Sequence, residues 1–153
     1  MKVEIRAQDL LSYAGDALIV NLFEGVGQPG GATGAVDRAL GGSIAAAIQR
    51  KEFKGKLHER LLLHTTGQLP VARVLVIGLG KSEELTLERV RSASAEAMRH
   101  LRGAGAQMVG SIVHGAGIGG WQPIRRPARS PRAHCWVSIG LINIKSWKRT
   151  GRR

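Results

Sequence analysis

The sequence is poor in cysteine and lacks long apolar runs. Cys135 is the only cysteine among 153 residues, so no internal disulfide can form and nothing indicates an oxidising compartment. No apolar run approaches the roughly 18 residues that a membrane-spanning helix needs, and residues 1–6 show no apolar core of a signal peptide. We therefore expect a cytoplasmic protein with no membrane partner.

Acidic residues are missing from the last part of the chain. The net charge is +12, but residues 1–120 hold 14 Lys and Arg against 11 Asp and Glu, whereas residues 121–153 hold 9 Lys and Arg and no acid. The same last part contains all three tryptophans and three of the five prolines. This change of composition divides the chain into a domain over 1–120 and a basic tail over 121–153. We expect the tail to be poorly structured and mostly disordered, apart from a short apolar piece at 136–142.

A glycine-rich stretch follows the first long apolar run. Residues 16–23 predict a buried strand, and the four-residue spacing of Val36, Leu40, Ile44 and Ile48 predicts a helix from about 35 to 50. Between them the chain must turn through positive φ and bring its backbone close to something. The turn is interpreted as a packing turn. A phosphate cradle is the alternative, and its candidate residues are Gly30, Gly31, Thr33 and Gly34.

Strands and helices alternate along the rest of the domain. The patterns predict a marginal strand at 2–6, a hairpin of 61–65 with 71–80, and a final strand at 108–113. Val74–Ile77 is uninterrupted and apolar, which predicts helices on both faces of its sheet. A second helix is expected over 85–102, with these residues facing inward: Leu87, Val90, Ala97, Met98 and Leu101. Together these elements predict an α/β fold, a three-layer sandwich with a mixed sheet flanked by helices.

Four short motifs carry a resemblance to a known family. They are GDALIVNLFEGV (15–26), GAVDRALGG (34–42), EFKGK (52–56) and VIGLGK (76–81). In this respect residues 1–120 resemble the N-terminal domain of the leucine aminopeptidase (cytosol aminopeptidase) family. The resemblance implies a macro-domain-like fold and a cytoplasmic hexamer. It also implies a separate C-terminal domain in which two divalent metals, manganese or zinc, support removal of N-terminal residues from peptides.

The catalytic signature of that family is not found in this sequence. The motif NTDAEGRL does not occur, and the eleven acids are scattered rather than clustered as ligands of two metals. We therefore assign no catalytic, cofactor or metal residue and expect this truncated homologue to be inactive by itself. The histidines (His58, His64, His100, His114 and His134) share no metal-ligand spacing, and Cys135 has no partner histidine in a recognisable motif. Asp37 and Arg38 are expected to cap and pair at a helix start.

Two alternatives come from other functional classes. Asn21 and residues 30–36 partly resemble the ADP-ribose cradle of true macro domains, although Leu22-Phe23-Glu24 stands where small and amide residues are usual. That resemblance predicts an ADP-ribose or nucleotide-binding module. The tail, with its interleaved arginines, lysines and tryptophans, is typical of nucleic-acid-binding arms.

A change of reading frame after Gly120 would explain the tail. With suitable synonymous codons, pairing the third base of each codon with the first two bases of the next gives Ala-Glu-Gly-Ala-Leu-Leu-Gly-Leu-Tyr among other residues, which is similar to the next segment of the aminopeptidase family. Two bases of nearly every shifted codon are fixed by the residues present. If the frame was lost, the basic character of the tail was never selected for nucleic-acid binding.

Overall fold

The structure is a computed structural model that describes residues 2–112 and 136–143, with side chains described for 8–112. The strands are β1 (Lys2–Asp9), β2 (Gly15–Leu22), β3 (Arg60–His64), β4 (Val71–Gly78), β5 (Met108–Ile112) and β6 (Trp136–Asn143). The helices are α1 (Gly31–Ala39), α2 (Ser43–Gln49) and α3 (Leu87–Gly103), with 3-10 turns at Leu10–Ser12 and Ser82–Glu84.

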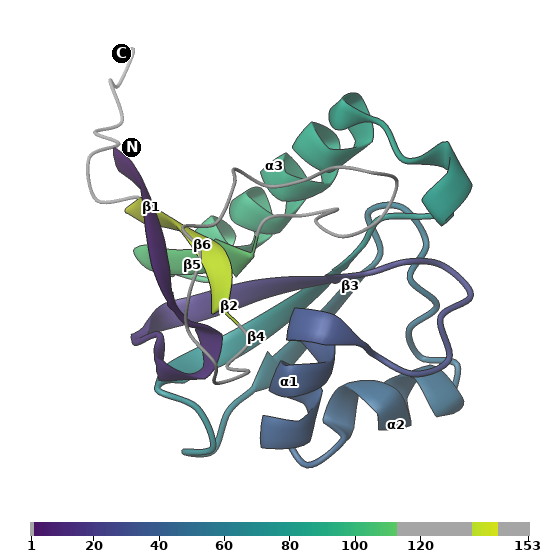
Figure 1. The fold of residues 1–153 in the computed structure, drawn as a ribbon, viewed down its shortest axis with the longest axis horizontal. Helices are drawn as coiled ribbons and strands as arrows, with labels where there is room; N and C mark the ends of the chain where they lie inside the picture. The colour runs from purple at the N-terminus through teal and green to yellow at the C-terminus, as the bar shows by residue number, and fades with distance from the viewer. Residues whose placement is uncertain (1, 113–135, 144–153) are drawn as a thin grey trace.

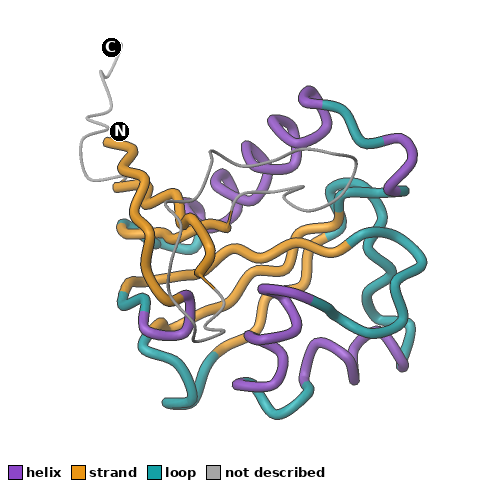
Figure 2. The backbone as a smooth tube through the Cα atoms, in the orientation of Figure 1, coloured by secondary structure: helices purple, strands orange, loops and turns teal. Residues whose placement is uncertain are grey.

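One mixed sheet runs through the middle of the domain. Its strand order is β1-β6-β5-β2-β4-β3. β2 is parallel to both β4 and β5, whereas β3 is antiparallel to β4, and β6 is antiparallel to both β5 and β1. Helix α3 covers one face, and α1 with α2 covers the other (Figures 1 and 2). The α/β three-layer sandwich predicted from the sequence is therefore confirmed.

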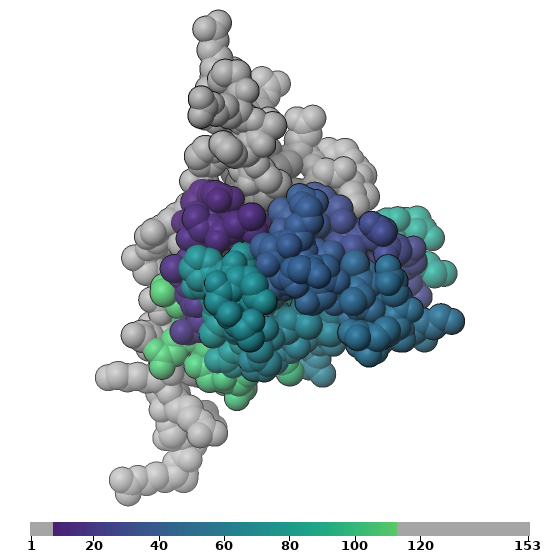
Figure 3. Space-filling model, turned by 90° about the horizontal axis from the view of Figure 1, so that it is seen from below, coloured from purple at the N-terminus to yellow at the C-terminus, as the bar shows by residue number. Residues whose placement is uncertain are grey.

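The two faces of the sheet bury separate hydrophobic cores. Alternate residues of β2 and β4 point to opposite faces, as the pleat of a strand requires. The α1–α2 core includes Leu18, Val20, Val74 and Val76 from these strands and Val36, Leu40 and Ile44 from the helical side. The α3 core includes Ala17, Ile19, Leu75 and Ile77 from the strands and Ala93, Ala97 and Leu101 from α3. Figure 3 shows the surface that α1 and α2 form over their core.

The strands expected from the sequence are present with small differences at their ends. The 61–65 and 71–80 pair is the antiparallel hairpin β3–β4, and the strand at 2–6 is β1 at one edge of the sheet. Val74–Ile77 is fully buried between helices on both faces, as predicted. Among the described residues, no helix combines the length and apolar character that crossing a bilayer requires.

The single helix predicted over 35–50 is two helices. Gly41 and Gly42 both adopt positive φ, +65° and +81°, and they end α1 and begin α2. The apolar spacing was informative about burial, because Val36, Leu40 and Ile44 all enter the same core. It could not report the break, since both helices present their apolar residues to one face. Adjacent glycines were the available signal of a break.

One other expectation about the helices needs correction. Leu87, predicted to face inward, is 52% exposed at the first position of α3, while Ala97 and Leu101 of that helix are buried as predicted. The apolar piece that the sequence analysis set apart from the rest of the tail, at 136–142, is strand β6. The rest of the tail lies outside the described residues, so its predicted disorder stays a prediction.

Asp37 caps α2 from the body of α1, which agrees with the capping role expected of it. Its Oδ1 accepts hydrogen bonds from the backbone N–H groups of Ile44 (2.7 Å) and Ala45 (3.2 Å), in the first turn of α2. The N-cap position itself is Gly42, which has no side chain to do this. Arg38 lies in the last turn of α1 rather than at a helix start.

Replacing Asp37 should weaken the junction between the two helices. We expect Asp37→Ala to lower the free energy of unfolding by about 1–2 kcal/mol, since two N–H groups lose their acceptor. Asp37→Asn keeps an acceptor oxygen and should lose less. Urea unfolding of the three proteins measures both values, and an Asp37→Ala variant as stable as the parent would show that the cap contributes nothing.

The ring of Tyr13 lies against the backbones of β2 and β5. A Cβ atom at Gly15 would overlap the ring, and one at Gly110 would lie 2.6 Å from Tyr13 Cε1, so glycine is required at both positions. The side chain is 3% exposed, and its hydroxyl has no hydrogen-bond partner among the described residues. Burial, with a smaller contribution from the Asp16 carboxylate, raises the pKa of Tyr13 from 10.0 to about 12.

Tyr13 should make the domain sensitive to alkali. The pKa of Tyr13 is about 12 in the folded protein and 10.0 in the unfolded chain. The contribution of the neutral Tyr13 side chain to the free energy of unfolding is therefore fully present below pH 10, and it is lost as the pH rises toward 12. Tyr13 is the only tyrosine, so the phenolate absorbance reports its titration alone. Removing the unpaired hydroxyl in Tyr13→Phe should raise stability at neutral pH by about 1 kcal/mol and abolish this alkaline loss. A Tyr13→Phe variant clearly less stable than the parent would mean that the hydroxyl has a partner.

Candidate functional site

In open α/β sheets, ligands usually bind in the crevice beyond the carboxyl ends of parallel strands, which here are the ends of β2 and β4. The loops that leave the two strands pair with each other: Leu79 N–H donates to Leu22 O (2.9 Å) and Glu24 N–H donates to Gly80 O (2.9 Å). The segment 53–59 then crosses the end of β4. His58 N–H donates to Gly78 O (3.1 Å), and Gly78 N–H donates to Glu59 O (2.8 Å). Backbone therefore occupies this end of the sheet.

Glycine is needed here for contact between backbones. A Cβ at Gly78 would overlap the carbonyl oxygen of Lys56, and one at Gly55, whose φ is +76°, would lie 2.5 Å from Phe23 O. Real Cβ atoms do not approach other atoms so closely, so any side chain would push the 53–59 segment away. The glycines of the EFKGK and VIGLGK motifs thus serve packing of this segment.

The four residues of the alternative phosphate cradle fall into two pairs. Thr33 is buried, and its Oγ1 donates to the backbone oxygen of Asn21 (2.6 Å), which ties α1 to the end of β2. Gly34 is buried as well, and a Cβ there would lie 2.6 Å from Pro29 O. Gly30 and Gly31 face open space, and Gly31 has a φ of +53°. Thr33 and Gly34 have packing roles, and the ADP-ribose alternative stays a prediction.

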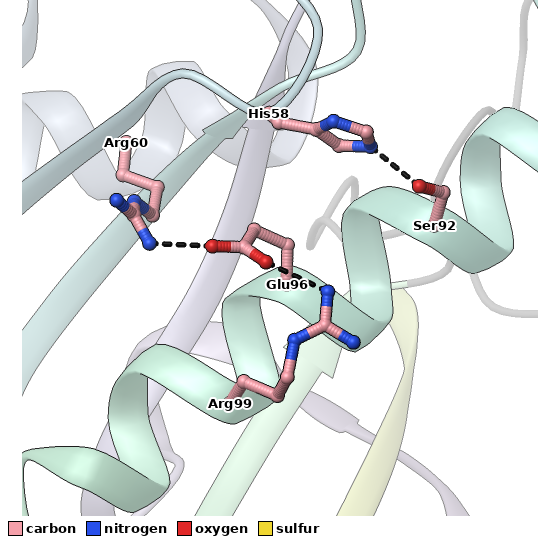
Figure 4. A network of polar contacts seen from close by, with 5 residues as sticks. All are labelled: His58, Arg60, Ser92, Glu96 and Arg99. Atoms are coloured by element: carbon pink, nitrogen blue, oxygen red, sulfur yellow. Dashed lines mark hydrogen bonds and ion pairs between the residues drawn. The ribbon is translucent and has the colours of Figure 1, made fainter.

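A polar cluster joins the 53–59 segment and β3 to α3 (Figure 4). Ser92 Oγ and His58 Nε2 are 2.5 Å apart, and Glu96 contacts Arg60 (2.5 Å) and Arg99 (2.7 Å). The hydrogen bond from Arg99 is the main reason that the pKa of Glu96 is lowered; partial desolvation opposes this, and the charges of Arg99 and Arg60 add to the lowering. His58 adopts a φ of +66°, which is uncommon for a residue with a side chain. The cluster fastens the segment to the helix on the surface.

Other carboxylates of the domain accept hydrogen bonds from backbone N–H groups. Asp16 Oδ2 accepts from the N–H groups of Gln107 (2.7 Å) and Met108 (2.8 Å), which holds the start of β5 beside β2. Glu59 Oε2 accepts from the N–H groups of Lys54 (3.0 Å) and Lys56 (2.9 Å). These oxygens shape loops and strand starts.

The described residues contain no group of three or more His, Cys, Asp and Glu side chains placed to hold a metal ion. His58 and His64 are exposed near the two ends of β3, and His100 is half-buried on α3. His114, His134 and Cys135 lie outside the described residues. The donor set of this domain therefore does not fit the two divalent metals that the resemblance implies, and we derive no chemical step through them.

Comparison with family models gives the affiliation of the chain. Residues 19–119 match the N-terminal domain of the cytosol aminopeptidase family. The chain belongs to the cytosol aminopeptidase family. The resemblance found in the sequence is thereby confirmed.

Named relatives agree with this affiliation. A probable cytosol aminopeptidase of Geobacter sp. (strain M21) is 42% identical over 102 residues, which are 67% of this chain and 20% of that protein. The probable cytosol aminopeptidase of Geobacter sulfurreducens is 34% identical over 116 residues, 76% of this chain and 23% of that protein. The chain thus spans about a fifth of the length of the curated relatives that it matches.

Solved structures agree on the fold. The macrodomain of Mycobacterium tuberculosis DarG superposes with a TM-score of 0.60 at 19% identity, covering 76% of this chain and 79% of that one. A mutant of tomato leucine aminopeptidase superposes with a TM-score of 0.53 at 20% identity, covering 67% of this chain and 21% of that one. The cytosol aminopeptidase N-terminal domain therefore has a macrodomain-like fold here, as the sequence predicted.

The sequence reasoning missed the residues that fasten the 53–59 segment. His58 and Ser92 are far apart in the sequence and belong to no motif, so no pattern indicated their contact. Gly55 was visible within EFKGK, but its positive φ and its approach to Phe23 could not be deduced from a single glycine between two lysines.

Gly34→Ala tests whether the glycine stretch is a packing turn. The added Cβ meets the Pro29 carbonyl, and we expect a loss of about 1–3 kcal/mol in unfolding free energy despite the better helix propensity of alanine. Gly27→Ala is the control, because Gly27 lies in the loop that leads into α1 and nothing lies near its Cβ position. That control should be neutral or gain up to about 1 kcal/mol. A Gly34→Ala variant more stable than the parent would rule out the close contact with Pro29.

Proposed function

We propose that this chain is the non-catalytic N-terminal domain of a cytosol aminopeptidase and that it hydrolyses no peptide by itself. The observation that carries the proposal is the match of 19–119 to the N-terminal domain of the family, in a chain spanning about a fifth of its relatives. The relatives are named as probable cytosol aminopeptidases, and more than three quarters of each lies beyond the part that corresponds to this chain.

The contacts that the carboxylates make support the proposed lack of peptidase activity. A two-metal hydrolase needs several carboxylates that converge on the ions and lower the pKa of a bridging water. Here the oxygens of Asp16, Asp37 and Glu59 accept backbone N–H groups, and Glu96 contacts two arginines. These four carboxylates hold parts of the domain together.

The remaining parts of the proposal concern assembly and the tail. We infer a cytoplasmic protein whose domain contributes to a hexamer when it is joined to the rest of an aminopeptidase, and a loss of reading frame after Gly120. The genomic DNA downstream of codon 120 tests the frame. A shifted frame that encodes the metal-ligand motif NTDAEGRL would support the loss, and a downstream sequence without any such motif in the three frames would refute it.

Peptidase assays test the absence of activity directly. The purified chain, incubated with leucyl-p-nitroanilide and manganese, should release no more nitroaniline than the protein-free blank. A full-length Geobacter cytosol aminopeptidase, prepared in the same way, is the positive control. Hydrolysis that co-elutes with the chain, rises in proportion to its concentration and is abolished by a chelator would overturn the proposal.

A further inference from the structure

Strand β6 fills an interior position of the sheet although it lies outside the matched part of the chain. The family match ends at residue 119, and β6 spans Trp136–Asn143. The strand lies between β1 and β5 and is antiparallel to both (Figure 1). A segment that the family match does not include thus has two neighbours within the domain.

The pairing on the β1 side is complete. Each of the eight residues of β1 is opposite a residue of β6, from Lys2 with Asn143 to Asp9 with Trp136. Among the described strands, β6 is the only sheet neighbour of β1. The place of β1 in the sheet therefore depends on β6.

The pairing on the other side covers the whole of β5. Met108 is opposite Asn143, and Ile112 is opposite Ile139. Without β6, the N–H and C=O groups along this side of β5 would have no strand partner, and an open edge of this kind readily pairs with another extended segment.

The sequence of the tail explains which of its segments can form a strand between β1 and β5. Residues 133–144 form the longest run in the tail without lysine, arginine or proline. Proline cannot donate to a ladder, and β-branched and aromatic residues favour strands. The eight residues Trp-Val-Ser-Ile-Gly-Leu-Ile-Asn meet these demands. Ladder hydrogen bonds join backbones, so they tolerate many sequences.

We propose that the space between β1 and β5 is a strand-binding slot, and that residues 136–143 of the same chain occupy it and complete the sheet. The occupant is an uncharged extended segment of eight residues, bound antiparallel on both sides by its backbone. The tail beyond the matched domain thereby has a folding role that is independent of its basic charge. This role does not depend on the history of its reading frame.

Paired cysteines test the slot and its register in the full chain. In a Cys135→Ser background, Ala7→Cys with Ser138→Cys places two cysteines opposite each other, where Cβ atoms are about 4.5–5.5 Å apart and a disulfide can form with a small adjustment. Ala7→Cys with Val137→Cys is the matched control, because adjacent residues of a strand point to opposite faces. We expect a disulfide within one chain in the first variant and little in the second, as measured by mass spectrometry and non-reducing gels.

The alternative outcomes of the cross-linking each overturn the proposal. Equal cross-linking in both variants would mean that the segment samples many positions, and no cross-linking would mean that it lies elsewhere. Disulfides between two chains in the first variant would mean that the slot is filled by a second copy rather than by the same chain.

A proline in β6 tests whether the slot holds β1. Ile139 is opposite Arg6 on one side and Ile112 on the other, so Ile139→Pro removes a backbone donor from the ladder. We expect the amides of residues 2–9 to lose protection from hydrogen exchange. Ser146→Pro, three residues beyond the strand, is the control and should leave that protection unchanged. Unchanged protection in Ile139→Pro would overturn the proposal, and the cysteine pairs decide the case if this variant fails to fold.

Discussion

Burial of β2 and β4 on both faces is the constraint on which the rest of the domain depends. Ala17–Val20 and Val74–Ile77 are at most 1% exposed, so every residue of these two runs must find an apolar neighbour. Burying an aliphatic side chain of this size contributes about 1.5–3 kcal/mol, and leaving one face uncovered would forfeit half of these contributions. Helices are therefore required above and below, and the alternation of residues determines which helix each side chain meets.

The positions of several carboxylates in the domain follow from the same two-sided, partly parallel sheet. Parallel strands need long connections, and their starts and loops leave N–H groups without a ladder partner. Asp16 of β2 supplies an oxygen to two such groups at the start of β5, Asp37 of α1 to two at the start of α2, and Glu59 to two within its own 53–59 segment. A carboxylate that already accepts two backbone hydrogen bonds is held in place by the fold. Collecting such groups around metal ions would require the loops that they stabilise to rearrange.

The sequence predicted the layers well and the close contacts poorly. Apolar runs and their period report which face a residue buries, so the strands, the hairpin and the two-sided core could be read directly. The break at Gly41-Gly42 could not, because the apolar period continues across it. Leu87 shows the limit at a helix end, where the period extends past the last residue that the core covers. At the candidate site, Gly34 and Gly78 were visible as glycines, but which backbone approaches them depends on the folded chain.

The strands of this sheet differ in how strongly their positions restrict the choice of side chains. The second half of β2 and all of β3, β4 and β5 fall within the matched residues 19–119, and β2 and β4 must be apolar at consecutive positions because helices cover both faces. β1 and β6 fall outside that match and are neighbours at one edge, paired with each other along their full length. Ladder hydrogen bonds join backbones, so they tolerate many side chains. The match to the family model accordingly covers the strands that fill the two cores, and it does not include β6, which the ladder joins to β1 and β5.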